Sequence, residues 1–290
     1  MPLTEHASKL WRVGHGRTIE LGPKAVIMAI VNVTPDSFSD GGRHSTVDAA
    51  VARALEAVNE GAAIIDIGGE STRPDAAPVS AAEEQARVLP VIEALRGRSD
   101  VLISIDTYRA ETARLAMAVG ADIINDVFGL QKEPEIATVA AKTDAGLCLM
   151  HTGRERRKLA DIIADQFLFL EQSLEIAFKA GVERETIVLD PGFGFAKDTR
   201  ENIELMTRFS ELHKLGFPIL AGTSRKRFIG AITGREAADR DAGTAATSAL
   251  LRLRGAAIFR VHNVAINRDA LAVADAMLDA GSGFERKGTA

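Results

Sequence analysis

The stretch GAAIID (Gly61–Asp66) returns in related form as GADIIN (Gly120–Asn125) and GAAIFR (Gly255–Arg260). The glycine that opens each copy is typical of a helix end. The apolar pair that follows suits a strand buried on both faces. Each copy therefore predicts a helix followed by a strand, and the polar residue that closes it falls in the same register near the carboxyl end of the strand.

Eight apolar runs of strand length, each followed by a polar or glycine-rich segment and a helical pattern, extend this repeat along the chain. The runs are Ala25–Val33, Ala63–Gly68, Val101–Asp106, Ile123–Asp126, Gly146–His151, Ile187–Asp190, Pro218–Gly222 and Ala257–His262. Strands and helices that alternate eight times predict a single-domain (β/α)₈ TIM barrel. We expect a short cap or hairpin over residues 1–24, the barrel over 25–281 and a polar tail over 282–290.

Shorter signals mark where the helices begin and end. Ser80 with Glu83, and Asp198 with Glu201, have the spacing of a capping box at a helix start. Five glycines are placed where a helix is expected to stop: Gly61, Gly120, Gly181, Gly255 and Gly281.

The composition narrows the class of protein. Of 290 residues, 46% are hydrophobic and 26% charged, which is typical of a globular chain with a large core. A net charge of -5 argues against a nucleic-acid binder. The single cysteine, Cys148, allows no intrachain disulfide and is expected to be a buried thiol. Residues 1–17 lack the apolar core of a signal peptide and no apolar run approaches the length of a membrane span, so we expect a cytoplasmic protein.

Two features favour an anionic ligand at the barrel mouth. Arg260 and His262 are two residues apart on the last strand, so they lie on one face and can clasp a phosphate. Buried cations are costly, and we prefer a ligand to a structural ion pair as their partner. The loops Asn32–Gly42 and Gly68–Pro74 add hydroxyl groups and a guanidinium beside glycine pairs.

Four polar residues follow other strands and suit a different part of a ligand. They are Asp106, Asn125, Asp190 and Lys226. Together they offer carboxylate acceptors, an amide and an ammonium, which match the edge of a planar heterocycle. A salt bridge such as Asp190 to Lys226 remains the alternative explanation for members of this set.

An ordered series of motifs, one for each of several strands, strongly resembles the dihydropteroate synthase family of folate biosynthesis. The motifs are Asn32–Gly42, Glu70–Pro74, Ser104–Thr107, Asn125–Val127, Asp190–Phe195, Ser224–Lys226 and Arg260–His262. The resemblance runs from about Ala25 to about Gly281. It implies a transferase that condenses 4-aminobenzoate with the diphosphate ester of hydroxymethyl-dihydropterin and releases pyrophosphate.

The resemblance also implies roles for single residues. Asp106, Asn125, Asp190 and Lys226 would hold the pterin. Asn32 would meet Mg²⁺ and the diphosphate, and Arg260 and His262 would grip phosphate oxygens. The 4-aminobenzoate site would be bordered by Thr72, Arg73, Phe195 and Ser224. A homodimer through helices such as Ala242–Leu253 is a further implication.

Three positions depart from the family pattern, and three other functions stay open. Asn263 stands where an acidic residue is usual, Asp75 where a glycine is common, and the basic stretch Thr152–Lys158 is shorter than usual. His151 is interpreted as structural, and Asp66 has no assigned role. The alternatives are a methyl-transfer domain that binds pterins, an aldolase that forms a Schiff base on Lys226, and a pterin-binding protein without activity.

Overall fold

The computed structural model describes residues 8–34, 43–70 and 79–285. Its centre is a sheet of eight parallel strands in the order β8-β7-β6-β5-β4-β3-β10-β9. A parallel bridge between Leu189 and Ile219 joins the two ends of this order and closes the sheet into a barrel. The strands are β3 (Val26–Asn32), β4 (Ile64–Gly68), β5 (Leu102–Asp106), β6 (Ile123–Asp126), β7 (Gly146–Met150), β8 (Ile187–Asp190), β9 (Leu220–Ala221) and β10 (Ile258–Val261). All eight coincide with the predicted runs, so the predicted TIM barrel is confirmed.

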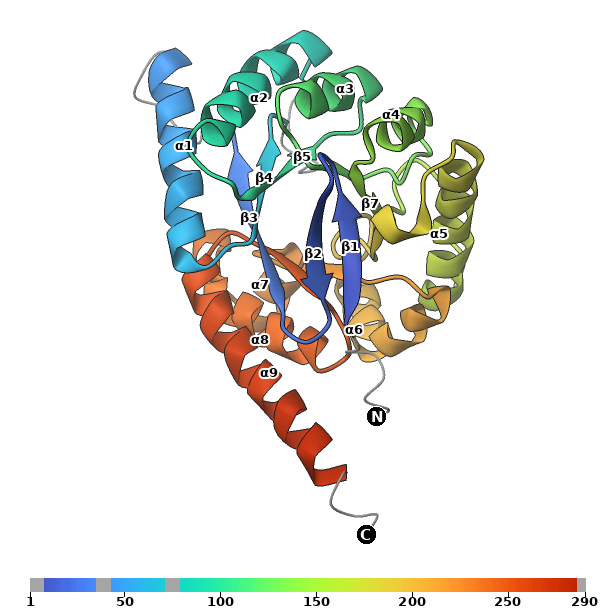
Figure 1. The fold of residues 1–290 in the computed structure, drawn as a ribbon. Coiled ribbons are helices and arrows are strands. Elements are labelled where there is room, and N and C mark those ends of the chain that lie inside the picture. Colours follow the sequence, from blue (N-terminus) through green and yellow to red (C-terminus); the bar gives the residue numbers. More distant parts are fainter. Residues whose placement is uncertain (1–7, 35–42, 71–78, 286–290) are drawn as a thin grey trace.

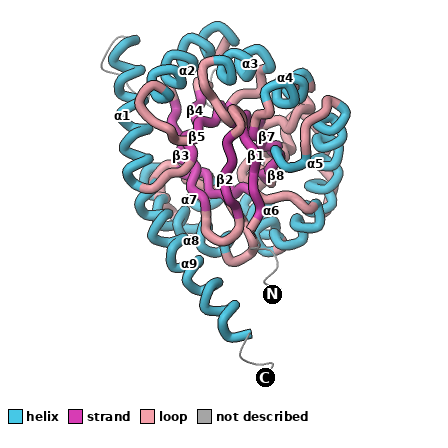
Figure 2. Tube along the Cα trace, viewed as in Figure 1, coloured by secondary structure: helices cyan, strands magenta, loops and turns pink. Residues whose placement is uncertain are grey.

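Helices surround the barrel on the outside (Figures 1 and 2). They are α1 (Arg43–Glu60), α2 (Ala81–Arg96), α3 (Ala110–Ala118), α4 (Glu135–Thr143), α5 (Ile162–Lys179), α6 (Thr199–Thr207), α7 (Arg227–Thr233), α8 (Asp241–Arg252) and α9 (Val264–Glu285). Both predicted capping boxes are present, Ser80 with Glu83 at α2 and Asp198 with Glu201 at α6. These caps satisfy backbone N–H groups that a helix start leaves without partners.

The predicted helix stop at Gly281 is wrong. Gly61, Gly120, Gly181 and Gly255 follow helices with positive φ angles, as expected. Helix α9 instead continues through residue 281 to Glu285 and extends away from the barrel (Figure 1). A glycine lowers helix propensity by about 1 kcal/mol, which weakens a helix without ending it. The proposed domain limits at residues 24/25 and 281/282 stay predictions.

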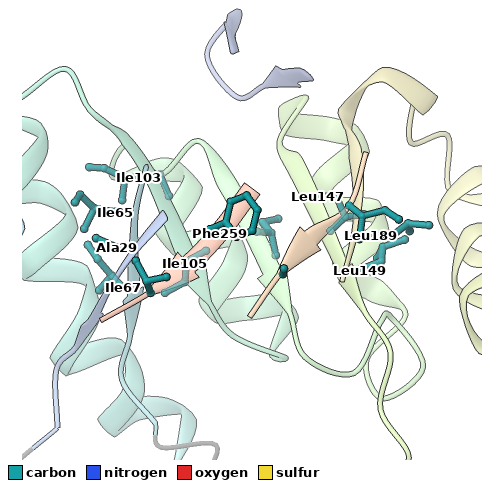
Figure 3. Packing of buried hydrophobic residues seen from close by; sticks show 14 of the residues in the cluster. Ala29, Ile65, Ile67, Ile103, Ile105, Leu147, Leu149, Leu189 and Phe259 are labelled. Carbon is teal, nitrogen blue, oxygen red and sulfur yellow. The ribbon is translucent and has the colours of Figure 1, made fainter. Parts of the chain in front are cut away.

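The barrel strands bury side chains on both faces, in alternation. Outward-facing residues such as Ile65 and Ile67 pack against the helices in one large cluster, part of which Figure 3 shows. Inward-facing residues low in the barrel, such as Ile64 and Met28, form a second apolar cluster. Two residues further along β4 on that inward face comes Asp66, and on β10 Arg260 follows Ile258. The barrel is therefore apolar at its floor and polar near the carboxyl ends of its strands.

A hairpin of β1 (Lys9–Val13) and β2 (Arg17–Leu21) packs on the apolar floor (Figure 1). Trp11 is fully buried there, and its indole N–H donates to the Thr186 carbonyl at 2.7 Å. Because the hairpin occupies the amino-terminal end of the strands, the opposite end is left for a ligand.

Candidate active site

A cavity of about 600 Å³ opens at the carboxyl ends of the strands. Six of the predicted site residues line it: Asn32, Asp106, Ser224, Lys226, Arg260 and His262. Asn125, Asp190 and Phe195 lie buried beside them. Thr72 and Arg73 lie outside the described residues. Register explains the convergence, because Gly68 pairs with Asp106 and Asp106 pairs with Asn125 across neighbouring strands.

Arg260 joins two carboxylates at the base of the cavity. Its Nε donates to Asp66 Oδ2 and its Nη2 to Asp106 Oδ2, both at 2.6 Å. Burial opposes the guanidinium charge, but the two carboxylates outweigh it and raise the pKa of Arg260. Burial also raises the pKa of Asp106 to about 7, against the pull of Arg260. Nε and Nη2 of Arg260 therefore form ion pairs within the protein, and the expected phosphate contact stays a prediction for its other N–H groups.

Asp66 gains a role that its sequence context did not reveal. It is fully buried, and its Oδ2 also accepts from Asn125 Nδ2 at 3.3 Å. The Asp66 carboxylate thus holds both the Arg260 guanidinium on β10 and the Asn125 amide on β6, two strands that are far apart in the sequence. The repeated motif predicted that Asp66 lies near the carboxyl end of its strand, but a sequence pattern cannot name a partner on another strand.

Asp190 and Lys226 form the opposite wall. Asp190 Oδ1 accepts from the Gly192 N–H at 2.7 Å, and burial raises the pKa of this carboxyl to about 6. Burial lowers the pKa of Lys226 to about 8. The Lys226 ammonium lies 4.1 Å from the centre of the Phe195 ring, and the Arg154 guanidinium 4.6 Å from it. This aromatic ring therefore holds two cations at the edge of the cavity.

His262 is held by Ser224. Its Nδ1 lies 2.9 Å from Ser224 Oγ, which also accepts from the His262 backbone N–H at 3.2 Å. Burial and the cations around it lower the pKa of His262 to about 3, so the ring is neutral. When Ser224 donates to Nδ1, the proton of the neutral ring is on Nε2. His262 can then offer a hydrogen bond to an anion but no charge.

Asn32 is the predicted magnesium ligand. Within the described residues no three His, Cys, Asp or Glu side chains are grouped so as to hold a metal ion. Asn32 offers one amide oxygen at the cavity, near Gly68. Magnesium commonly keeps several waters and takes one or two protein oxygens together with substrate phosphates. This donor set fits a metal ion that is held mainly by a bound diphosphate.

Several cationic residues around the cavity were not predicted as site residues. They are Arg154, Lys197, Arg225, Arg227 and Arg240. Arg154 belongs to the basic stretch after His151, and Lys197 follows the Asp190–Phe195 motif by two residues. Both residues lie in loops that follow barrel strands, and this position is the sequence feature that could have identified them as site residues.

Asn263, a departure from the family pattern, donates to Asp241 Oδ2 at 3.0 Å, and Asp241 in turn pairs with Arg225.

A closed α/β barrel with a polar, partly cationic cavity at its carboxyl end defines a barrel enzyme for a small ligand with a flat ring and an anionic group. A family model described as pterin binding enzyme matches residues 28–262. The dihydropteroate synthase of Bacillus subtilis is 45% identical over 258 residues, which are 89% of this chain and 90% of that protein. The chain belongs to the dihydropteroate synthase family of pterin-binding enzymes.

Solved structures agree with this assignment. Xanthomonas albilineans dihydropteroate synthase with 4-aminobenzoic acid has a TM-score of 0.88 and 44% identity, over 93% of this chain and 98% of that one. The same enzyme in complex with 7,8-dihydropteroate has a TM-score of 0.82 and 43% identity, over 90% and 96% of the two chains.

Proposed function

We propose that this protein condenses 6-hydroxymethyl-7,8-dihydropterin diphosphate with 4-aminobenzoate to give 7,8-dihydropteroate and pyrophosphate. The observation that carries the proposal is the ring of polar groups at the strand ends, where Asp106 and Lys226 line one cavity and Asn125 and Asp190 lie buried beside them. Family membership adds the substrates, since relatives are named as dihydropteroate synthases.

The buried polar groups suit the pterin ring. The Asp190 carboxylate can accept N–H groups of the heterocycle, and the Lys226 ammonium can donate to its carbonyl or ring nitrogen. Asp66 holds the amide of Asn125 and the guanidinium of Arg260 in place. Fixed donors and acceptors of this kind orient the methylene group that reacts.

In the reaction, the methylene carbon–oxygen bond breaks and its electron pair leaves with pyrophosphate. The amine nitrogen then bonds to the methylene carbon and loses one proton. The main demand on the protein is to stabilise negative charge that grows on the leaving group. His262 would donate a hydrogen bond to it, and Arg260, already paired with two carboxylates, would act through its remaining N–H groups. Magnesium held by Asn32 and the diphosphate would supply further positive charge.

The amine subsite would lie beside Phe195 and Ser224, with Thr72 and Arg73 as further members. 4-Aminobenzoate is an anion, and Arg154 and Lys226 at the Phe195 ring favour it there. An aromatic amine is a weak nucleophile that is neutral near pH 7, so positioning matters more than a strong base.

Release of pyrophosphate from the pterin diphosphate tests the proposal. We expect turnover to require both 4-aminobenzoate and Mg²⁺, and chelation of the metal to abolish it. If turnover depended on neither 4-aminobenzoate nor Mg²⁺, the proposed reaction would be refuted. A protein that binds the pterin without any turnover would instead be a relative without activity.

We also propose that the protein forms a homodimer through α8. We propose further that it acts in the cytoplasm. Leu250 on α8 is 53% exposed, and Val273 and Met277 on the neighbouring α9 are 64% and 59% exposed. Exposed apolar side chains on two helices that pack together favour a partner surface. Leu250→Glu should shift the mass in analytical ultracentrifugation from dimer to monomer, and a wild-type monomer would rule the dimer out. None of the helices in the described ranges is long and apolar enough to cross a membrane.

A further inference from the structure

Lys197 lines the cavity beside Phe195, and its ammonium group is largely enclosed by protein. Lys197 is only 8% exposed. Its Nζ lies 2.8 Å from the Gly192 carbonyl, 3.4 Å from the Phe195 carbonyl and 2.9 Å from His151 Nδ1. An ammonium group has three N–H donors, so all of them are used by protein acceptors. Lys197 therefore has no donor left for a substrate.

His151 connects this ammonium to a buried carboxylate. Its Nε2 lies 3.0 Å from Asp165 Oδ2, and Asp165 also accepts from Arg156 at 2.5 and 3.0 Å. While its ammonium is charged, Lys197 can only donate, so His151 Nδ1 accepts from it and a neutral ring carries its proton on Nε2. His151 Nε2 faces both Asp165 Oδ2 and, at 2.8 Å, Arg156 Nη2. The ring stays neutral because burial and the charge of Lys197 lower the pKa of His151 to about 3. Asp165 thus orients the ring that orients Lys197.

The backbone around Lys197 has an unusual shape that the ammonium helps to hold. Gly192, Gly194 and Ala196 have φ angles of +65°, +79° and +50°. A left-handed conformation costs a residue with a side chain about 1–2 kcal/mol, so Ala196 needs support from its surroundings. The turn directs two carbonyls, those of Gly192 and Phe195, at the Lys197 ammonium, which binds them both.

We propose that Lys197, oriented by His151 and Asp165, is a positioning residue for the aromatic amine, because it fixes the backbone on which Phe195 is placed. The inference rests on the proposed function. It separates the two substrates, because Asp190 is anchored differently. The Asp190 carbonyl accepts from the His151 backbone N–H at 2.8 Å, and its strand β8 pairs with β7. Phe195 lies outside the strands: its N–H donates to the Gly192 carbonyl at 3.2 Å, and its own carbonyl accepts from the Gly153 N–H at 3.4 Å. Because Lys197 binds both of these carbonyls, loss of the ammonium should disturb the amine site first.

The test is steady-state kinetics of Lys197→Met with each substrate varied in turn. Burial lowers the pKa of Lys197 to about 7, so the assay is run below that pH, where the wild-type side chain is charged. We expect the KM for 4-aminobenzoate to rise about tenfold or more, and the KM for the pterin diphosphate to change by less than about threefold. An unchanged KM for the amine, or an equal rise in both KM values, would overturn the proposal.

Lys158→Met is the matched control. Lys158 Nζ touches the same loop from the solvent side, at the Ala196 carbonyl, 2.7 Å away. We expect it to change the KM for the amine by less than about twofold, because an exposed contact contributes little. An effect as large as that of Lys197→Met would mean that any loosening of the loop is sufficient, and the buried network would lose its special role.

Asp165→Asn keeps the inference testable if Lys197→Met does not fold. It preserves the volume of the side chain and an acceptor for His151 but removes the charge. We expect a smaller rise in the same KM and little change for the pterin, and the reverse pattern would refute the proposal. Loss of amine-dependent pyrophosphate release in the wild-type protein would contradict the proposed function instead, so the two failures are distinguishable.

Discussion

Arg260 shows how one side chain can serve both the fold and the site. Its two bonds to Asp66 and Asp106 connect β10 with β4 and β5 across the barrel. Removing one partner of a buried ion pair leaves the other charge without compensation. The residue is therefore expected to matter for stability even before a substrate binds.

Arg260→Ala should lower the free energy of unfolding by about 3–5 kcal/mol, because two buried carboxylates lose their partner. Denaturant titration followed by circular dichroism measures this. Adding Asp66→Asn to the same chain should recover part of the loss, since one uncompensated carboxylate is then absent. If the double variant is no more stable than Arg260→Ala, the pair is not the source of the stability.

Asp190 is expected to make pterin binding depend on pH. Burial raises its pKa to about 6, and only the ionised carboxylate accepts hydrogen bonds with both oxygens. Pterin affinity should therefore fall as the pH drops below about 6, by about tenfold for each further unit. Calorimetric titration over this range checks the prediction. Asp190→Asn should bind more weakly at every pH and without this slope, and a slope that survives would assign it to another group.

At the scale of elements, the turn after β8 depends on one close backbone approach. A Cβ at Gly192 would lie 1.9 Å from the His151 carbonyl oxygen. Gly192→Ala should therefore lower the melting temperature and raise both KM values, because the turn must move away from β7. Gly234→Ala is the control, since Gly234 has a similar φ of +70° with nothing within 4 Å. Gly234→Ala should lower the free energy of unfolding by only about 1–2 kcal/mol, which is the strain of a left-handed backbone at a residue with a side chain. Similar losses in both variants would show that φ alone matters.

The strands were predictable because their apolar runs are buried on both faces, and the shared position of Asp66, Asn125 and Arg260 near the carboxyl ends followed from the repeated motif. Contacts between strands were not predictable, because sequence periodicity gives the face of a side chain and not its partner. The pairing of Arg260 with Asp66 is one example. The link from Lys197 to His151 is another, since 46 residues separate them. The prediction of a helix end at Gly281 was wrong because a glycine permits a helix to end without requiring it.

At the scale of the whole molecule, residues at the amino-terminal end of the barrel serve stability, and residues at the carboxyl end of its strands serve chemistry. Trp11 in the hairpin packs on the floor, far from the strand ends that line the cavity. Trp11→Ala should destabilise the protein by about 3–5 kcal/mol, as expected for a large buried aromatic side chain. The KM values and kcat of the folded fraction should stay within about twofold of wild type at low temperature. A large change in KM would mean that packing at the amino-terminal end of the barrel affects substrate binding at the carboxyl end.

The distribution of charge along the cavity has a consequence for how a substrate enters. Carboxylates gather at the strand ends, at Asp66, Asp106 and Asp190, whereas loop and helix residues that line the cavity include Arg154, Arg227 and Arg240. Arg260 and Lys226 lie among these carboxylates and compensate much of their charge, so the uncompensated positive charge is concentrated at the outer residues. A molecule with a hydrogen-bond-donating ring at one end and an anionic tail at the other is turned by this field before it makes contact. Of the two orientations, we expect the cationic outer residues to favour entry with the ring first and the anionic tail outward.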